Sequence, residues 1–253
     1  MNTEQQVYVR SFRIEPSILE EEEYYVRLPA VQHLQKRGAL SLQSPVTFLV
    51  GENGTGKSTL LEALAVCCGF NPEGGSINFN FSSRASHSGL HRRLQLVRAP
   101  IRPKDGFFLR AESFYNVATE IERMDEIPAF TPQIISSYGG KSLHEQSHGE
   151  SFMALMLNRF GGKGLYILDE PEAALSPSRQ MALLAAIHGL VGKASQFIIS
   201  THSPILMAYP GALIYELKEQ ELSLTPYKET EHYQVSRRFL EASEKMLHYL
   251  FEE

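Results

Sequence analysis

Short apolar runs alternate along the chain with segments whose apolar residues recur at helical spacing. The clearest runs cover residues 46–50, 165–168 and 197–199, and glycine, acidic or polar residues bound each of them. Continuous apolar runs of this length are typical of strands buried on both faces of a parallel sheet. The pattern therefore predicts an α/β fold with a mostly parallel central sheet and helices on both faces.

The segments outside these runs complete the predicted architecture. Alternating apolar residues over 7–14, together with Tyr24, Tyr25 and Val26, predict an N-terminal antiparallel β part. Residues 77–81 predict a further strand. Residues 32–40 fit either a loop or a short strand. Near the C-terminus, apolar residues between 235 and 250 fall near helical spacing, which predicts a helix with one face docked on the body.

A glycine-rich loop joins the first apolar run to a helix. The sequence GENGTGKST at residues 51–59 fits the pattern Gly, four residues, Gly-Lys-Ser/Thr, and an apolar segment follows it. Strand, glycine turn and helix are the context in which this pattern binds nucleotide phosphates. The residues expected to contact ATP are Gly51, Asn53, Gly54, Thr55, Gly56, Lys57, Ser58 and Thr59.

The residue types in this loop suit a triphosphate and its metal ion. Glycines let backbone N–H groups approach the phosphates, and the N-terminus of the following helix adds unpaired N–H groups. Lys57 supplies a positive charge for the outer phosphates and is an expected catalytic residue. Ser58 offers a hydroxyl to Mg²⁺, a hard cation that prefers oxygen ligands.

Two further strand ends carry side chains suited to phosphate chemistry. The run 165–168 leads into Asp169 and Glu170, at the edge of the sheet where ligands bind in open α/β folds. We expect Asp169 to hold Mg²⁺ and Glu170 to polarise the water that attacks the γ-phosphate. His202 follows the run 197–199. Taken alone it is more often a structural histidine, but after the two earlier motifs it is interpreted as a contact of the γ-phosphate or the attacking water.

In this order the motifs resemble ABC-type ATPases, and most of all the small soluble ATPases of the RecF, SMC and OLD branch. The resemblance covers nearly the whole chain, so residues 1–253 are expected to form a single ABC-type P-loop NTPase domain with a signature-bearing helical insert at roughly 82–160. Ser147 and Gly149 match the family signature Leu-Ser-Gly-Gly-Gln, while His148 replaces a glycine and Glu150 replaces the glutamine.

The resemblance implies a head-to-tail homodimer that sandwiches two ATP molecules. In this fold the signature segment cannot reach its own phosphate loop, so ATP joins two subunits and hydrolysis weakens their contact. Residues 174–177 correspond to the loop after the catalytic glutamate but lack its aspartate. The family's Mg²⁺-contacting glutamine has no clear counterpart, because residues 110–113 contain no glutamine and Gln95 lies in a basic stretch.

Two other features suggest ligand contacts and also have simpler structural explanations. Tyr25 lies about one hairpin upstream of the phosphate loop, where it can stack on adenine or pack in the core. Residues 84–104 contain basic side chains and no acid, which fits either a nucleic-acid or acidic-partner patch or the solvated surface of the insert. These basic residues are Arg84, Arg92, Arg93, Arg98, Arg102 and Lys104.

Composition limits the location and the class of partner. The net charge is −5, from 24 basic and 29 acidic residues, which gives no overall bias toward nucleic acid or anionic membrane. Cys67 and Cys68 are adjacent and make no disulfide framework. The N-terminus lacks a signal-peptide pattern, and no apolar run reaches the roughly 18 residues that span a bilayer. A cytoplasmic protein without membrane insertion is therefore expected.

The sequence predicts a Mg²⁺-dependent ATPase and leaves its output open. The first hypothesis is a soluble ABC-type ATPase whose ATP-bound homodimer switches a partner protein, such as a nuclease or effector in DNA repair or defence. The second is the nucleotide-binding subunit of a membrane transporter, and the third is a non-hydrolysing, ATP-gated interaction module. A small-molecule kinase fits less well, because it leaves the signature segment and His202 without a role.

Overall fold

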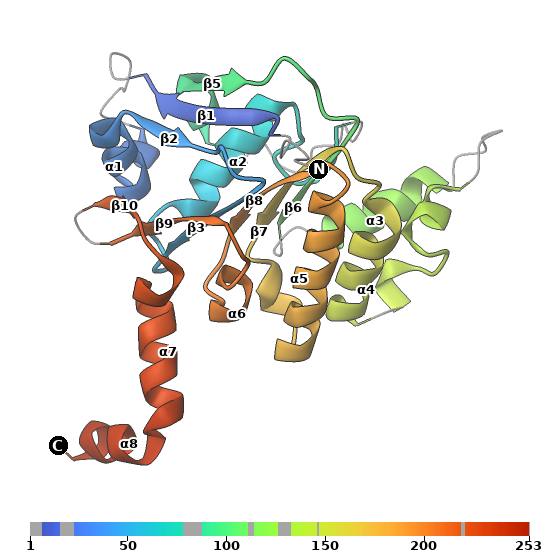
Figure 1. The fold of residues 1–253 in the computed structure, drawn as a ribbon. Helices are drawn as coiled ribbons and strands as arrows, with labels where there is room; N and C mark the ends of the chain where they lie inside the picture. Colours follow the sequence, from blue (N-terminus) through green and yellow to red (C-terminus); the bar gives the residue numbers. More distant parts are fainter. Residues whose placement is uncertain are drawn as a thin grey trace.

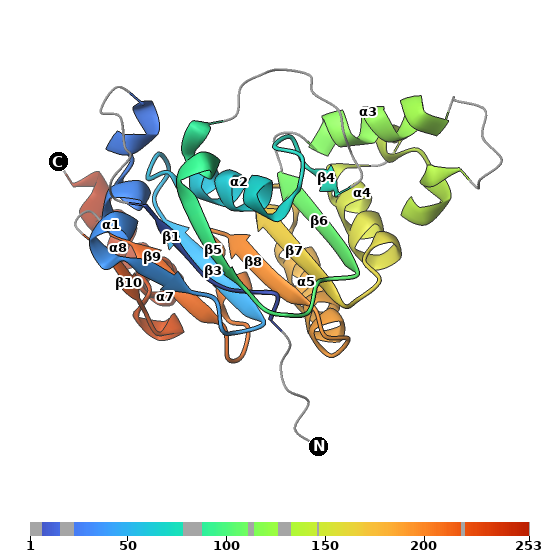
Figure 2. The same cartoon turned by 90° about the horizontal axis from the view of Figure 1, so that it is seen from above.

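Two β-sheets with a helix between them form the body of the protein (Figures 1 and 2). The computed structural model describes residues 7–15, 23–77, 88–110, 114–125, 133–145, 147–218 and 221–252. The larger sheet contains β3 (Val46–Gly51), β4 (Gly75–Ser76), β6 (Asp105–Arg110), β7 (Gly164–Asp169), β8 (Gln196–Ser200), β9 (Leu213–Leu217) and β10 (Leu222–Leu224). The smaller sheet contains β1 (Val9–Ile14), β2 (Ala39–Ser41) and β5 (Leu94–Arg98).

The larger sheet brings the three chemical motifs to one edge. Its order is β10-β9-β3-β8-β7-β6-β4, and the five strands from β9 to β6 run parallel. Ser200 at the end of β8 pairs with Leu49 on one side and with Asp169 on the other. The phosphate loop, the two carboxylates and His202 therefore follow neighbouring strand ends. The predicted α/β class with a mostly parallel sheet is confirmed.

The smaller sheet is antiparallel, in the order β2-β1-β5. An N-terminal antiparallel part was expected, but its members differ from the prediction. Residues 24–26 are not a strand and belong to a 3-10 helix, Tyr24–Arg27, while residues 32–37 belong to α1 (Pro29–Arg37). Pro29 stands at the first helical position, where its fixed φ favours a helix and no N–H is missed. Strand β5 comes from the basic stretch instead.

Helix α2 (Lys57–Cys68) lies between the two sheets (Figure 1). Its apolar residues are buried against both sheets, in one core cluster with Phe12, Leu40 and Ile198. A helix covered on both sides needs apolar residues all round, and this explains why its sequence shows little amphipathic pattern. The helix ends at Gly69, which has the left-handed conformation expected of a C-terminal cap.

Helices that come after β6 in the chain cover the opposite face of the larger sheet. They are α3 (Phe114–Asp125), α4 (His148–Ala154) with a π-helical turn over Leu155–Arg159, α5 (Pro177–Val191) and the short α6 (Pro204–Met207). Figure 2 shows α3 and α4 together at one end of the sheet. The helical part of the insert begins at residue 114, because residues 94–98 and 105–110 lie in strands. The strand expected at 77–81 falls mostly outside the described residues.

Asp105 anchors the end of this insert to the sheet. Its carboxylate accepts hydrogen bonds from Arg159 Nη1 at 2.8 Å, Tyr166 Oη at 2.8 Å and the Gly161 N–H at 3.0 Å. Burial alone raises the pKa of this carboxyl, but these three donors outweigh burial and the net pKa is lowered. The ionised carboxylate therefore stabilises the fold.

We expect Asp105→Asn to destabilise the protein by about 2 kcal/mol at neutral pH, because the charged acceptor is lost. A depressed carboxyl pKa contributes stability above the unfolded pKa of about 3.9 and loses it as the pH falls further. The difference in unfolding free energy between wild type and variant should therefore shrink below about pH 4. Urea titrations across pH measure it, with the exposed Glu241→Gln as control. A difference that is constant with pH contradicts the assignment.

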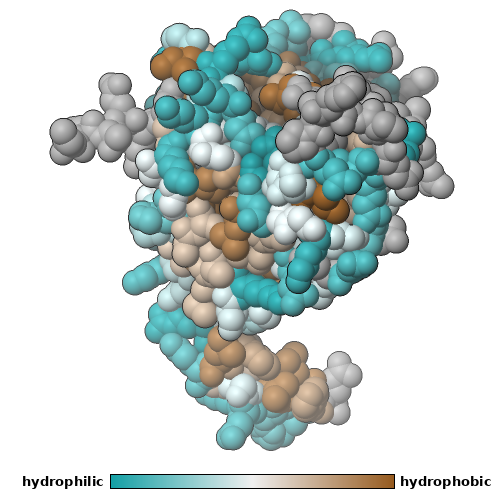
Figure 3. Space-filling view, turned by 90° about the vertical axis from the view of Figure 1, so that its right-hand side faces the viewer, coloured by the Kyte–Doolittle hydropathy of each residue, from teal (hydrophilic) through white to brown (hydrophobic). Residues whose placement is uncertain are grey.

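The C-terminal helices α7 (Glu231–Glu241) and α8 (Ser243–Phe251) project away from the body (Figure 1). The prediction that their apolar face docks on the body is wrong. The structure describes every residue of the two helices, and none of these residues is buried. Leu240, Leu250 and Phe251 are 80%, 65% and 78% exposed, and Figure 3 shows apolar surface gathered on this arm. No helix among the described residues has the length and hydropathy to cross a bilayer.

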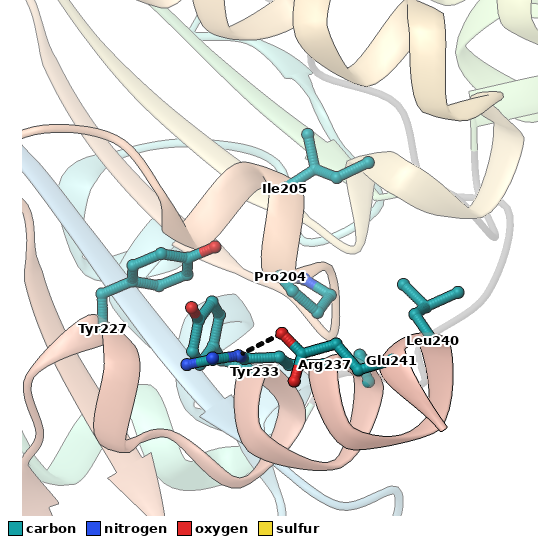
Figure 4. A pocket seen from close by; sticks show the side chains of 8 residues that line it. Pro204, Ile205, Tyr227, Tyr233, Arg237, Leu240 and Glu241 are labelled. Carbon is teal, nitrogen blue, oxygen red and sulfur yellow. Dashed lines mark hydrogen bonds and ion pairs between the residues drawn. The ribbon is translucent and has the colours of Figure 1, made fainter. Parts of the chain in front are cut away.

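A pocket of about 330 Å³ lies where α7 leaves the body (Figure 4). Pro204 and Ile205 of α6 form one side, and Tyr233 and Leu240 of α7 form the other. Arg237 and Glu241, joined by an ion pair of 2.8 Å, also line it. The base of the arm therefore faces α6, the helix that follows His202, across this pocket.

Candidate functional site

The phosphate loop forms a groove of about 170 Å³ at the carboxyl edge of the larger sheet. Gly56 precedes α2 with a φ of 93°, a conformation that side chains rarely adopt. A Cβ at this position would also lie 2.9 Å from the Leu28 side chain. The loop therefore requires glycine here for its backbone to wrap inward. The lining residues are Leu28, Asn53, Gly54, Gly56, Lys57, Ser58, Thr59 and Glu170.

Lys57 lies inside the curve of this loop. Its Nζ donates hydrogen bonds to the carbonyl oxygens of Gly51 at 2.7 Å and Glu52 at 2.8 Å, and the residue is 3% exposed. Burial lowers the pKa of Lys57, and the nearby carboxylates of Glu170 and Asp169 oppose that shift. A buried cation with only two neutral acceptors is well suited to phosphate oxygens, because they supply the missing negative charge.

Asp169 and Ser58 form the expected metal-binding pair. Ser58 Oγ donates to Asp169 Oδ1 at 3.1 Å, and Ser200 Oγ donates to the same oxygen at 2.5 Å. Burial raises the pKa of Asp169, opposed first by the Ser200 bond and by Arg110. The described residues hold no cluster of three or more His, Cys, Asp or Glu that could bind a metal. The Ser58 hydroxyl and the Asp169 carboxylate lie beside the phosphate groove and fit Mg²⁺, which takes few protein ligands and keeps substrate oxygens and waters.

Glu170 and His202 lie together at the mouth of the groove. Glu170 has a φ of 50°, a left-handed conformation, and its N–H donates to the Ser200 carbonyl and to Ser200 Oγ, each at 3.1 Å. Its Oε1 lies 3.4 Å from His202 Nε2. The backbone N–H of His202 donates separately to Glu172 Oε1 at 2.5 Å. The turn after β7 and the segment after β8 thus bring a carboxylate and an imidazole to one place, as a site for activating water requires.

Two residues of this site were not found from the sequence. Arg110 at the end of β6 pairs with Glu62 of α2 at 2.7 Å, and its Nε lies 3.9 Å from Asp169. Arg110 is the first residue of the segment 110–113, which was considered as a counterpart of the family's Mg²⁺-contacting glutamine. The other residue considered, Gln95, lies on β5 and accepts a hydrogen bond from Arg13 at 2.9 Å. In the sequence, only the presence of Glu62 as a single acidic residue within the apolar helix α2 pointed to this ion pair.

The second is His232, whose Nε2 lies 3.2 Å from His202 Nδ1. The two histidines are 30 residues apart, and His232 comes from the first turn of α7. Burial lowers the pKa of both imidazoles, so the folded state favours their neutral forms. Nothing in the sequence indicated this contact, because it depends on where α7 begins relative to the sheet.

The signature segment lies apart from this groove. Ser147 caps α4 by accepting the N–H of Glu150 at 3.4 Å, and the Glu150 carboxylate accepts the Ser147 N–H at 3.1 Å. Arg179 of α5 lies 3.4 Å from Glu150. A Cβ at Gly149 would come within 2.7 Å of the Ala174 carbonyl and would also meet Arg179. Glycine therefore allows α4 to pack on the turn after Glu170.

Tyr25 and the basic stretch at residues 84–104 were both considered as ligand contacts. Tyr25 is 2% exposed and belongs to the core around α2, so the prediction that its ring stacks on adenine is wrong. A ring covered on both faces has none free for a base. Arg84 of the basic stretch lies outside the described residues, and Arg98 donates to the Cys67 carbonyl at 2.5 Å. None of the described residues of this stretch lines the phosphate groove.

Two family models match this chain, and each covers one part of the candidate site. Residues 32–109, which hold the phosphate loop, match a family described as "AAA domain". Residues 151–208, which hold the two carboxylates and His202, match one described as "AAA domain, putative AbiEii toxin, Type IV TA system". Curated relatives extend the similarity over most of the chain.

The chain is 28% identical over 204 residues to an uncharacterized ABC transporter ATP-binding protein of Haemophilus influenzae, covering 75% of each. It is 28% identical over 195 residues to the cobalt import ATP-binding protein CbiO of Salmonella typhimurium, covering 71% of this chain and 69% of CbiO. These findings support an ABC-type ATPase that binds ATP. The resemblance to the narrower group of small soluble ATPases is not tested by them.

Two of the solved structures that are similar to this chain share low sequence identity with it. One is an ATP-binding cassette of an ABC transporter, with 16% identity, a TM-score of 0.49 and coverage of 93% of this chain and 98% of the other. Another is the SMC head domain from Thermotoga maritima, with 14% identity, a TM-score of 0.43 and coverage of 87% and 99%.

Proposed function

We propose that this protein hydrolyses ATP in a Mg²⁺-dependent reaction and uses the cycle to switch a partner protein. The observation that carries the proposal is the meeting of four side chains at one sheet edge. Lys57 and Ser58 come from the phosphate loop, and Glu170 and His202 from the ends of β7 and β8. Binding alone would need no carboxylate and imidazole aimed together beside the groove.

Each residue has a defined task in this reaction. The loop backbone and Lys57 bind and orient the phosphates, while Ser58 and Asp169 hold Mg²⁺, which neutralises developing charge on the phosphate oxygens when bound. Glu170 accepts a proton from the attacking water, and His202 Nε2 donates a hydrogen bond on the same side. Burial around Lys57 and Asp169 excludes bulk water and strengthens these electrostatic contacts.

We further propose that the active form is a head-to-tail homodimer. The Ser147–Gly149 segment is not among the residues that line its own groove, and it lies against Arg179 of α5 and the Ala174 carbonyl instead. In a head-to-tail pair, this segment of each subunit approaches the terminal phosphate bound by the other. The location expected of such a protein is the cytoplasm, and a protein effector or nucleic acid, through the basic stretch, is the proposed partner class.

A phosphate-release assay on the purified chain tests the catalytic part. We expect turnover that depends on ATP and Mg²⁺ and that EDTA abolishes. ATP binding without phosphate release, at any Mg²⁺ concentration, would identify a non-hydrolysing ATP-gated module instead.

A transporter subunit is the second candidate, because both curated relatives are described as transporter ATP-binding proteins. It predicts that the chain co-purifies with an integral membrane protein when the cell membrane is gently solubilised. The first candidate predicts a partner in the soluble fraction. Affinity purification from both fractions of the native cell decides between them.

A further inference from the structure

His232 connects the C-terminal helix α7 to the catalytic centre. We propose that it is a positioning residue, which fixes the ring of His202 and keeps the proton of that ring on Nε2. This inference rests on the proposed ATPase function, because it assigns to His202 a hydrogen bond toward the terminal phosphate. The argument depends on the contacts of the two imidazoles and on how α7 is held.

The two rings are close enough that one must donate to the other. His202 Nδ1 lies 3.2 Å from His232 Nε2, and the ring centroids are 5.3 Å apart at an angle of 52°. A neutral imidazole has one N–H group and one nitrogen without a proton. Either His232 donates to His202, or His202 donates to His232.

The surroundings assign the direction of the bond. His202 Nε2 faces the Glu170 carboxylate at 3.4 Å, and a bare nitrogen there would place two lone pairs against each other. His202 Nε2 and His232 Nδ1 are both buried and make no hydrogen bond among the described residues. A proton on His232 Nδ1 would be a buried donor with no acceptor, whereas a proton on His202 Nε2 faces the negatively charged oxygen of Glu170 at 3.4 Å. Both ends therefore favour donation from His232 Nε2–H to His202 Nδ1, with the second proton on His202 Nε2.

The sheet itself holds His232 in place. Glu216 of β9 is 1% exposed, and its Oε1 accepts the N–H of Glu231 at 2.7 Å. Thr230 caps the helix by accepting the Tyr233 N–H at 3.4 Å. Strand β9 lies next to β3, which carries the phosphate loop. The first turn of α7 is thus fixed to the same sheet as the groove, as a residue that orients another must be.

Kinetics separate positioning from a merely structural role. We expect His232→Ala to lower kcat roughly tenfold, because His202 then samples the wrong tautomer, and to leave KM for ATP within about twofold. His232→Gln should restore most of the loss, since its amide N–H can donate to the same nitrogen. Gln234→Ala, an exposed change on the same helix, is the matched control and should not affect kcat. Equal kcat for the Ala variant and wild type, or equal loss in the Gln and Ala variants, overturns the proposal.

A spectroscopic test on nucleotide-free protein does not need turnover. Ring ¹⁵N shifts of selectively labelled histidines report which nitrogen carries the proton. Wild-type His202 should show the Nε2–H form, and His232→Ala should show a mixture of both forms. An Nδ1–H form in the wild type contradicts the proposal directly. If wild type releases no phosphate but shows the Nε2–H form, the ATPase function fails while the pairing of the two histidines stands.

Discussion

Glu170→Gln is expected to stop ATP turnover while leaving ATP binding intact. Glu170 provides the carboxylate that faces His202 Nε2 at 3.4 Å beside the groove, and an amide of the same shape cannot accept the proton of the attacking water. Losing a general base typically costs about 10²–10⁴-fold in rate. The variant leaves the rest of the phosphate groove unchanged. The affinity for ATP should stay within about threefold, because the Glu170 carboxylate acts on the attacking water and is not needed to bind ATP.

The same variant should reveal the proposed dimer. If hydrolysis is what separates the two subunits, a form that binds ATP without cleaving it should accumulate as a pair. Light scattering with ATP and Mg²⁺ should then give a doubled molecular mass, and removing ATP should restore the monomer. Glu52→Gln makes the same charge change at an exposed position of the phosphate loop and is the matched control. A variant that turns over like wild type, or stays monomeric at high concentration with ATP, contradicts the mechanism.

Two inactive variants should recover activity when mixed, if each site is built from two subunits. Lys57→Ala removes the buried cation of the groove and should lose ATP binding by at least about 100-fold, because the phosphates lose a charge-assisted contact in a desolvated place. Ser147→Asp keeps a side-chain acceptor at the helix cap and adds a negative charge that repels the partner's phosphate. Because the Ser147 hydroxyl donates to Glu150 at 2.7 Å, a thermal melt checks that the variant is folded. A mixed dimer contains one site with neither change.

The expected recovery is large and specific. In an equal mixture, half of the randomly formed dimers are mixed and each has one intact site, so phosphate release should reach about a quarter of the wild-type rate. Each variant alone should stay near background, and Ser147→Asp alone should still bind ATP. Mixing Lys57→Ala with Glu170→Gln is the control, because both changes lie on the same side of the site and the mixture then retains no intact one. If Ser147→Asp hydrolyses ATP like wild type, its segment does not contact the phosphate.

Local physics was enough to predict the central sheet and most of the groove. Short apolar runs bounded by glycine and polar residues are typical of buried strands, and a glycine-rich loop between a strand and a helix suits close approach to phosphate. The residues that line the groove or follow its strands, among them Lys57, Ser58, Asp169 and Glu170, lie within short motifs. Their neighbours in sequence therefore carry most of the information about their position.

The wrong predictions have a common cause. A sequence pattern shows which face of a helix or strand is apolar, but it does not show what that face packs against. Tyr25 was an aromatic at a suitable distance along the chain, and only the packing of α2 between two sheets showed that its ring is covered. The apolar face of α7 and α8 looked like a docking face, but the chain turns outward after residue 230 and leaves that face exposed.

By itself the sequence determined the main parallel strands of the larger sheet, the phosphate loop and the chemical types of the groups around it. The tertiary structure alone decided which distant groups meet them: Arg110 with Asp169, His232 with His202, and Gly149 with the turn after Glu170. The physical reason is that a strand end or a helix start fixes the direction of a side chain only relative to its own element. The contact between two elements depends on how the whole sheet packs, which no short stretch of sequence contains.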